Sequence, residues 1–447
     1  MRAYAIAAAI YGELRGYHRW TIRRRVAAAA RMSAAELAEA AERLFQFRVR
    51  DAIRRFPEYA EKVRRFRGRL PAESERVAPE ELPIWTRADQ RQLFASLPGP
   101  PLPDSFAHST GGSTGVPLRF YVTRESFEWR SAVSDRGYSW AGAEEGRRSF
   151  YVWGTPIYRP GWRQRWKQHL HHFLQGRTYF DSFRFDDEQK RRCCQLINRL
   201  RPPILVGYTG NLLELARFVR DNPGLLRWRA RSLVTAAEGL LPGQRELLEA
   251  NLGGEVFVSY GSREFMLIGM ECERHAGYHL ASDNVYVEVV NDCGQPAAPG
   301  EVGRILITDL HNDATPFVRY EIGDWGMKAA GEDALCPCGR PFPLLAEVLG
   351  RVQEVILTPA GDRVTALFVP HLMKEFPWVE GYQLIQSSPE RVVLNLITRD
   401  PLTPAATQPI AEQLRQKLGT GMAIEFQRVE ELMRLPNGKT PIVVQAQ

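Results

Sequence analysis

The clearest chemistry in this sequence lies in one short segment rich in glycine and hydroxyl residues, Ser-Thr-Gly-Gly-Ser-Thr-Gly-Val-Pro at residues 109–117. Glycine permits positive φ and close backbone approach. Consecutive free N–H groups form an anion-binding concavity, to which Ser and Thr hydroxyls add donors. The segment therefore predicts a polyphosphate-binding loop, although a flexible turn has the same composition. It is not the common P-loop, because no Gly-Lys-Ser/Thr follows the glycines.

Other segments carry side chains that suit further steps of nucleotide chemistry. Tyr260 offers a flat face for adenine, and Glu264 is a hard carboxylate of the kind that Mg²⁺ takes. Asp324 can accept hydrogen bonds from both ribose hydroxyls, and Lys439 is a point charge close to the end of the chain. Each has a plainer alternative: a core tyrosine, a surface glutamate, a turn aspartate or a hairpin lysine.

Alternating apolar strands and helices must position these residues. The alternation predicts an α/β sheet with ligands at the carboxyl ends of its strands. Expected strands are Ile204–Tyr208, Leu233–Ala237, Val256–Tyr260, Tyr286–Val290, Arg304–Thr308 and Pro316–Tyr320, and expected helices are Leu212–Arg220 and Pro242–Ala250. Near the N-terminus, Ser33-Ala-Ala-Glu36 predicts a capping box that opens a helix with Leu37, Leu44 and Phe45 facing inward.

Three regions are predicted along the 447 residues, because one core rarely grows so large. Residues 1–104 are a helical, basic N-terminal part of a large domain, residues 105–350 its core, and residues 351–447 a small α+β unit. In that unit we expect strands at Glu354–Leu357, Val364–Leu367, Tyr382–Gln386, Val392–Ile397 and Ala423–Val429, and a helix at Pro409–Leu418.

The motifs occur in an order that resembles the adenylate-forming superfamily of acyl-CoA synthetases, luciferases and nonribosomal adenylation domains. The glycine loop is similar to its phosphate-binding signature, and Ala237-Glu238-Gly239 and Tyr260-Gly-Ser-Arg-Glu264 are similar to its adenine and magnesium segments. Pro316–Asp324 resembles its ribose segment. Gly350-Arg351 resembles its hinge, and Pro436-Asn-Gly-Lys439 resembles its catalytic-lysine segment. Gly-Tyr-Thr-Gly-Asn at 207–211 and Cys-x-Cys at 336–338 resemble the phenylacetate–CoA ligase and CapK-like branch. The resemblance spans residues 105–440 and implies a mixed α/β adenylation domain with a mobile C-terminal lid domain.

The resemblance also implies roles for individual residues. Lys439, Glu264 and Arg351 are expected to be catalytic, with Mg²⁺ at Glu264 and the hinge at Arg351 and Gln353. Expected nucleotide contacts are Ser109, Thr110, Gly111, Gly112, Ser113, Thr114, Gly115, Ala237, Glu238, Gly239, Tyr260, Gly261, Ser262 and Asp324, with Arg319 on phosphate oxygens. Two positions depart from the family pattern: Arg263 replaces a hydroxyl residue before the glutamate, and Gln353 replaces the usual Asp or Lys.

The implied activity is ATP-dependent activation of a small carboxylic acid as acyl-AMP with release of pyrophosphate, followed by acyl transfer. CoA is the family's commonest acceptor, so the resemblance implies CoA as the first expectation for the acceptor. An amine or amino acid, a carrier-protein thiol, or AMP transfer to a flavin-like hydroxyl are the alternatives. A nucleotide-binding scaffold without catalysis is the alternative from a different class. A homodimer is left open.

Cysteine and histidine residues predict a metal site of a different kind. Cys272 and His279 precede Cys336 and Cys338 by about sixty residues, and such thiolate and imidazole donors form tetrahedral zinc sites. With four protein ligands the site is structural, and His275 is an alternative ligand. Reduced buried cysteines without metal are the other reading.

Charge and hydropathy bear on the partners and the location of the protein. Residues 1–70 hold 17 Lys and Arg against 7 Asp and Glu, within a chain of net charge +7. Such a region suits an acidic partner, a phosphorylated cofactor or a membrane surface, or is a set of solvated helix faces. The sequence contains no base-reading nucleic-acid motif, no transmembrane run and no convincing cleavage site after residues 3–12, so we expect cytoplasmic residence.

Overall fold

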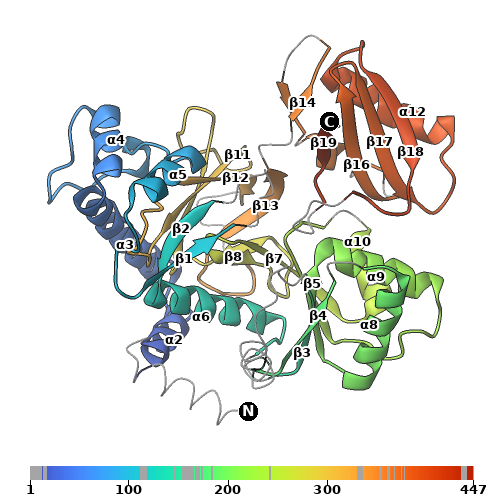
Figure 1. The fold of residues 1–447 in the computed structure, drawn as a ribbon, viewed down its shortest axis with the longest axis horizontal. Helices are drawn as coiled ribbons and strands as arrows, with labels where there is room; N and C mark the ends of the chain where they lie inside the picture. The colour runs from blue at the N-terminus through green and yellow to red at the C-terminus, as the bar shows by residue number, and fades with distance from the viewer. Residues whose placement is uncertain are drawn as a thin grey trace.

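The computed structural model of this chain describes residues 13, 18–110, 118–144, 147–153, 166, 172, 175–182, 185–240, 243–329, 336–351, 355–359, 363–366, 368–373, 375–376, 378–433 and 440–445. Figure 1 shows a large α/β body and a smaller C-terminal unit. The fold is a large mixed α/β domain with N-terminal helices and a small α+β domain, as predicted. No helix among the described residues is long and apolar enough to cross a membrane.

A large sheet forms the centre of the molecule. Among the described residues it has eleven strands in the order β10-β11-β12-β13-β9-β8-β7-β6-β5-β3-β4. One half is parallel and consists of β3 (Ser149–Trp153), β4 (Arg177–Asp181), β5 (Ile204–Tyr208), β6 (Ser232–Ala236) and β7 (Glu255–Ser262). The apolar faces of α8 (Asp187–Leu200), α9 (Thr209–Asp221) and α10 (Gln244–Leu252) share one buried cluster with these strands. The β5, α9, β6 and α10 elements confirm the predicted alternation to within a few residues.

The other half of the sheet is antiparallel. It consists of β8 (Met266–Met270), β9 (Tyr278–Leu280), β10 (Val285–Val290), β11 (Val302–Asp309), β12 (Tyr320–Lys328) and β13 (Leu344–Arg351). Although β13, β9 and β8 separate β12 from β7 in the strand order, side chains of β12 and β7 meet. The sheet must therefore curl strongly between them.

Helices near the N-terminus cover this half. They are α2 (Arg19–Ala29), α3 (Ala34–Arg55), α4 (Pro57–Arg67), the 3₁₀ turn η1 (Pro79–Glu81), α5 (Arg87–Ser96) and α6 (Arg124–Trp140). The Ser33–Glu36 capping box that begins α3 is present, which confirms the prediction. Leu37 and Phe45 are buried as expected, and Phe45 contacts Tyr286 of β10 with ring centroids 4.7 Å apart.

The C-terminal unit has a buried cluster of its own, separate from those of the large sheet. Its elements are β14 (Val355–Leu357), β15 (Arg363–Thr365), α11 (Phe368–Met373), β16 (Val379–Ser388), β17 (Arg391–Thr398), α12 (Pro404–Leu418), β18 (Ala423–Arg428) and β19 (Val443–Gln445). Four of the strands pair in the order β18-β17-β16-β19. Ion pairs join this unit to the helices α8 and α9.

Two predicted elements differ from the structure. Residues 316–319 are not a strand, because β12 begins only at Tyr320. Proline lacks a backbone donor, and Arg319 has a left-handed φ of 49°, which interrupts an extended chain. In α12 the helix begins at Pro404 instead of Pro409, because Thr403 caps it by accepting from the N–H of Ala406. Pro409 lies inside the helix.

Candidate functional site

A β-hairpin presents the glycine-rich segment. The strands β1 (Ser105–Ser109) and β2 (Arg119–Thr123) pair in antiparallel register, so residues 110–118 connect them. The connection is closed at its base, where the N–H of Thr110 donates to the Leu118 carbonyl at 2.9 Å. The Thr110 hydroxyl accepts from the N–H of Leu118 and from Arg87. Ser109 and Thr110 are therefore held at one end of the loop, whereas Gly111–Gly115 lie outside the described residues.

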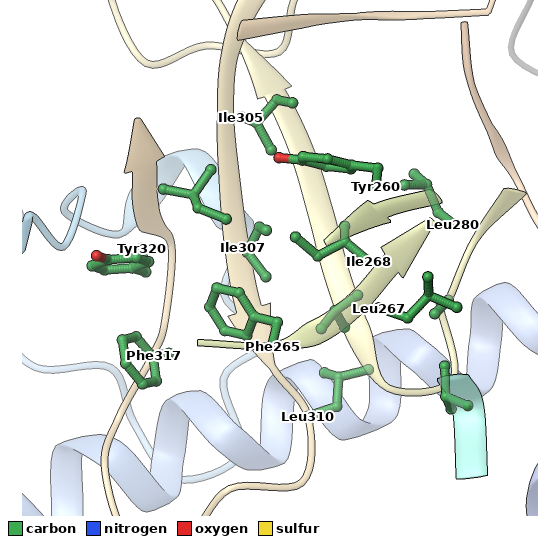
Figure 2. Close-up of a cluster of buried hydrophobic side chains, with 14 of the residues drawn as sticks. Tyr260, Phe265, Leu267, Ile268, Leu280, Ile305, Ile307, Leu310, Phe317 and Tyr320 are labelled. Carbon is green, nitrogen blue, oxygen red and sulfur yellow. The ribbon is translucent and has the colours of Figure 1, made fainter. Parts of the chain in front are cut away.

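Aromatic packing ties this hairpin to two of the other motifs. The rings of Phe120 and Phe317 meet edge to face with centroids 5.4 Å apart. Phe317 in turn contacts Phe265, the residue after Glu264, at 5.3 Å. Figure 2 shows Phe265 and Phe317 in the cluster that also holds Tyr320 and Tyr260. The hairpin, the ribose-like segment and the magnesium-like segment are thus fixed by one apolar cluster.

Two predicted nucleotide residues meet directly across the curl of the sheet. The Tyr260 hydroxyl donates to the Asp324 carboxylate at 2.9 Å, from β7 to β12. The backbone of Asp324 is in register with that of Arg351, and Trp325 with Gly350, in the β12–β13 pair. The predicted adenine, ribose and hinge positions therefore lie together at one edge of the sheet, where the carboxyl ends of β7 and β13 meet β12.

Glu264 lies in the tight connection between β7 and β8 and is only 5% exposed. Within the described part of the chain its carboxylate makes no hydrogen bond or ion pair. This donor chemistry fits a divalent cation bound through one carboxylate with most of its waters retained. The neighbouring Gly261 has a structural reason of its own, because a Cβ there would lie 2.2 Å from the Met266 carbonyl oxygen.

The Ala237-Glu238-Gly239 segment follows β6 at the same edge. Ala237 has a positive φ of 76°, an unusual conformation for a residue with a side chain. The Thr209 hydroxyl, at the start of α9, donates to the Glu238 carbonyl at 2.7 Å and holds this turn. The Glu238 carboxylate accepts from the N–H of Thr440 at 2.9 Å. The residue after Lys439 therefore lies against the predicted adenine segment.

Arg319 does not serve the role predicted for it. Its side chain is 1% exposed and pairs with Glu288 at 3.1 Å. Its guanidinium also donates to the carbonyls of Leu82 and Gly294. These buried partners use the donors that phosphate oxygens would need, so the expected phosphate contact is wrong and Arg319 is structural.

Several expected site residues have no described position or only a backbone position. Gly111, Gly112, Ser113, Thr114, Gly115, Gln353 and Lys439 lie outside the described residues. Arg351 is placed by the backbone register of β13 alone. Ser262 is half-buried at the end of β7, where its hydroxyl accepts from the N–H of Phe265.

The four expected metal ligands lie together. One ligand atom from each of Cys272, His279, Cys336 and Cys338 lies within 4.8 Å of all the others. The Sγ atoms of Cys272 and Cys336 are 3.6 Å apart, and Cys338 Sγ is 3.3 Å from His279 Nε2. Tetrahedral zinc with bonds of about 2.3 Å separates two sulfurs by about 3.8 Å, so the cluster has the right size.

The surroundings of the cluster also suit a metal. His279 Nδ1 is 3.2 Å from the Phe342 carbonyl, to which it can donate while Nε2 faces the thiols. Burial lowers the pKa of His279, which favours the neutral ring that a ligand needs. Backbone N–H groups of Arg274 and Arg340 donate to the sulfurs of Cys272 and Cys338.

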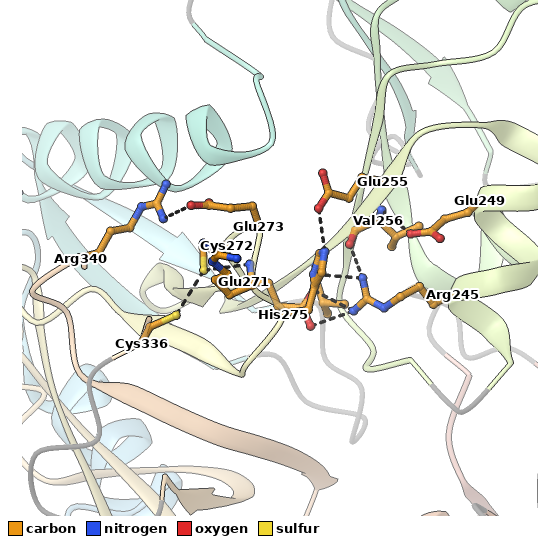
Figure 3. A network of polar contacts seen from close by, with 12 residues as sticks. Arg245, Glu249, Glu255, Val256, Glu271, Cys272, Glu273, His275, Cys336 and Arg340 are labelled. Carbon is orange, nitrogen blue, oxygen red and sulfur yellow. Dashed lines mark hydrogen bonds and ion pairs between the residues drawn. The ribbon is translucent and has the colours of Figure 1, made fainter. Parts of the chain in front are cut away.

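His275, the alternative ligand, lies in a different network (Figure 3). Its ring nitrogens contact Glu271 at 3.2 Å and Glu255 at 3.0 Å. Arg245 of α10 holds both oxygens of Glu271 at 2.9 Å. His275 therefore braces α10 against the β7–β8 hairpin, and it is not a member of the thiol cluster.

Sequence reasoning missed the positioning roles of Thr209 and Thr440. Thr209 follows directly after β5 in the Gly-Tyr-Thr-Gly-Asn run, and its hydroxyl reaches the turn after the neighbouring strand. A polar residue at the carboxyl end of a parallel strand was the available signal. Nothing local marked Thr440, because its partner is 202 residues away.

Comparison with known proteins identifies similar sequences. Residues 356–446 match the CapK C-terminal domain family. Phenylacetate-coenzyme A ligase of Thermus thermophilus is 27% identical over 259 residues, which are 56% of this chain and 55% of that protein. Protein CapK of Staphylococcus aureus is 22% identical over 342 residues, 74% of this chain and 72% of that protein. The match spans about half the length of the Thermus ligase.

Solved structures show the same fold. A crystal structure of 2-hydroxyisobutyryl-CoA ligase in the postadenylation state with 2-HIB-AMP superposes with a TM-score of 0.70 at 19% identity, covering 93% of this chain and 91% of that one. The same ligase in the thioesterification state superposes with a TM-score of 0.60. The resemblance to the phenylacetate–CoA ligase and CapK branch of the adenylate-forming superfamily is confirmed.

Proposed function

We propose that this protein is an AMP-forming ligase that activates a carboxylic acid with ATP and then transfers the acyl group to the thiol of CoA. The acid's carboxylate attacks the α-phosphate, pyrophosphate leaves, and acyl-AMP remains bound. The thiol then displaces AMP from the acyl carbon. The observation that carries the proposal is the contact between Tyr260 and Asp324, which joins two motif segments 64 residues apart at one edge of the sheet.

The proposed roles follow from the chemistry of each group. The Tyr260 ring stacks on adenine, and its hydroxyl orients Asp324, which accepts from the ribose. The turn at Ala237, Glu238 and Gly239, of which the first two residues are half-buried, borders the base. Glu264 would hold Mg²⁺, which supplies positive charge at the phosphates. Ser109 and Thr110, with the glycines and hydroxyls that follow, cradle the polyphosphate.

Lys439 is the proposed cation for the charge that develops on the reacting carboxylate and α-phosphate. We call the place formed by Tyr260, Asp324 and the turn at Ala237–Gly239 the nucleotide edge. The hydrogen bond from Thr440 to Glu238 supports the role of Lys439, because it brings the residue next to Lys439 to this edge. Such a pose fits the adenylation step.

The thiol cluster is proposed to hold one structural zinc ion. The four ligands would be Cys272, His279, Cys336 and Cys338, which leaves no position open for a substrate. The ion would clamp the β8–β9 region to the segment before β13. Its contribution is to the fold that positions β12 and β13.

An acid-dependent exchange of labelled pyrophosphate into ATP, run over a panel of aromatic and aliphatic carboxylic acids, tests the reaction class and finds the substrate. We expect exchange with at least one acid and magnesium. Mass spectrometry of the product with CoA then identifies a thioester. Exchange with none of the acids would favour a catalytically inactive scaffold, and an amide or a flavin adenylate as product would replace CoA as the acceptor.

A further inference from the structure

One carboxylate joins the C-terminal unit to the large domain. Glu380 lies in β16, and its side chain accepts from Arg220 of α9 at 2.9 Å and from Arg217 of α9 at 3.3 Å. Its backbone carbonyl accepts from Arg217 at 2.7 Å and from Gln244 of α10 at 3.0 Å. We refer to Arg217, Arg220, Gln244 and Glu380 as the Glu380 cluster.

The Glu380 cluster is well shielded from solvent. The side chains of Arg217 and Glu380 are 13% and 17% exposed. A charged pair at this depth is held by geometry and is less weakened by salt than a surface pair. Removing one partner leaves the other charge buried and uncompensated, which is the costly outcome at an interface.

A second pair at the same interface has the same polarity. Lys190 of α8 is 7% exposed on its side chain and lies 3.2 Å from the more exposed Glu431 of the C-terminal unit and 3.3 Å from Asp187 of its own helix. The large domain thus contributes cations from α8 and α9, and the C-terminal unit contributes the carboxylates. This complementarity favours one particular orientation of the two parts.

The same orientation brings Thr440 to Glu238. Because the partners lie on different domains, any rotation of the C-terminal unit as a body breaks the Glu380 cluster, the Lys190–Glu431 pair and the Thr440 contact together. We propose that Glu380 is a positioning residue that holds the C-terminal unit in the pose in which Thr440 contacts Glu238. The consequence for adenylation rests on the proposed function.

The chain provides a matched control. Arg399 of the C-terminal unit also contacts Glu380, at 3.2 Å, but it is 65% exposed and belongs to the same unit. Arg399→Gln therefore removes a charge from the same carboxylate without touching the interface. Glu380→Gln keeps the shape and the backbone carbonyl and removes only the charge.

The first measurement is hydrogen–deuterium exchange of the full chain, with fragmentation that resolves the Thr440 amide. It needs no substrate. In Glu380→Gln we expect the opening equilibrium reported by this amide to rise about 30-fold or more, the scale of breaking one buried charge pair. In Arg399→Gln we expect it to stay within about threefold of the wild type. Unchanged Thr440 exchange in Glu380→Gln, or an equal rise in Arg399→Gln, would overturn the proposal.

A double-mutant cycle guards against a folding defect in one variant. The double variant Arg217→Gln/Glu380→Gln should raise the opening equilibrium by less than the product of the two single-variant increases, because both substitutions remove the same interaction. Multiplicative effects would speak against a direct pairing.

The activity arm uses the pyrophosphate exchange assay with the acid found active in the panel. Glu380→Gln should lower exchange by the factor by which the closed fraction falls in the hydrogen–deuterium measurement, up to about 30-fold, and Arg399→Gln should leave it near the wild-type value. Exchange in Glu380→Gln that does not follow the closed fraction would refute the positioning role. A wild type without any exchange would refute the proposed function alone, because the Thr440 amide still reports the interface.

Discussion

At the scale of single residues, a few charges and hydrogen bonds decide the chemistry. Glu264 is the clearest case, because the residue is 5% exposed and its carboxylate makes no hydrogen bond or ion pair with the described residues. Arg319 is the opposite case, since Glu288 and two carbonyls satisfy it. Both residues lie in motifs that resemble the family. Their environments differ: Glu264 is available to a ligand, whereas Arg319 stabilises the fold.

Lys439→Ala should lower acid-dependent pyrophosphate exchange by roughly 10²–10³, the scale of losing one preorganised charge-stabilising group. The assay uses saturating ATP so that binding does not limit the rate. Lys417→Ala, an exposed lysine on α12, is the matched control and should retain activity. Equal exchange in Lys439→Ala and wild type would remove Lys439 from the mechanism.

Asp324→Ala should mainly weaken nucleotide binding, because it removes the proposed ribose acceptor. Tyr260→Phe keeps the ring and loses the hydrogen bond to Asp324, so we expect a smaller effect, about tenfold in the Kd, from one bond to a charged group. Calorimetric titration with a non-hydrolysable ATP analogue measures both. Asp400→Ala, exposed in the C-terminal unit, is the control. Unaltered affinity in Asp324→Ala would contradict the ribose site.

At the scale of elements, the thiol cluster and the His275 network stabilise neighbouring parts of the sheet. The cluster joins residues 272–279, which lead into β9, to residues 336–338, which precede β13. The His275 network joins α10 to the β7–β8 hairpin. The strands that bear the candidate site are therefore fixed from both sides.

Metal analysis of protein purified without added zinc should find one equivalent of zinc per chain. Cys336→Ser should lose the metal and lower the free energy of unfolding by about 4 kcal/mol, in the range of metal-site losses. Cys293→Ser is the control, because Cys293 is exposed and lies outside the cluster. A wild type with no stoichiometric metal would end the zinc proposal.

His275 should make stability depend on pH. The hydrogen bond to Glu271, together with Glu255, raises the pKa of His275 above its ordinary value, against the effect of burial. A raised folded pKa contributes stability that is fully present below the unfolded pKa of about 6.5 and is lost as pH rises through the folded pKa.

The free energy of unfolding lost in His275→Gln should therefore be larger at pH 6 than at pH 9, as measured by urea denaturation at both values. Glu255→Gln, which removes one of the two carboxylates, should reduce the pH dependence in part. A loss that grows with pH would show that the sign of this linkage is wrong.

At the scale of the whole molecule, two bodies with separate buried clusters meet along α8, α9 and α10 (Figure 1). We predict that residues 351–447 rotate between two catalytic poses about the Gly350-Arg351 hinge. Crystal structures with an ATP analogue, and with an acyl adenylate plus the acceptor, should show two orientations. The Glu380 cluster should be intact in the first and broken in the second. The same orientation in both complexes would contradict the rotation.

Local signals carried much of the fold. The sequence predicted β5 at its observed bounds, the capping box at Ser33 and the α9, β6 and α10 alternation, because period and caps depend on near neighbours. It also selected the four residues of the thiol cluster and the motifs that line the sheet edge.

Only the tertiary structure decided which distant groups meet. The curl of the sheet brings Tyr260 to Asp324, Arg319 pairs with the distant Glu288, and His275 lies with Glu271 and Glu255 instead of the thiols. The pairing of Glu380 with α9 was likewise unforeseen. Such contacts depend on strand register and domain orientation, which sum many weak interactions over the whole chain, so no short stretch of sequence encodes them.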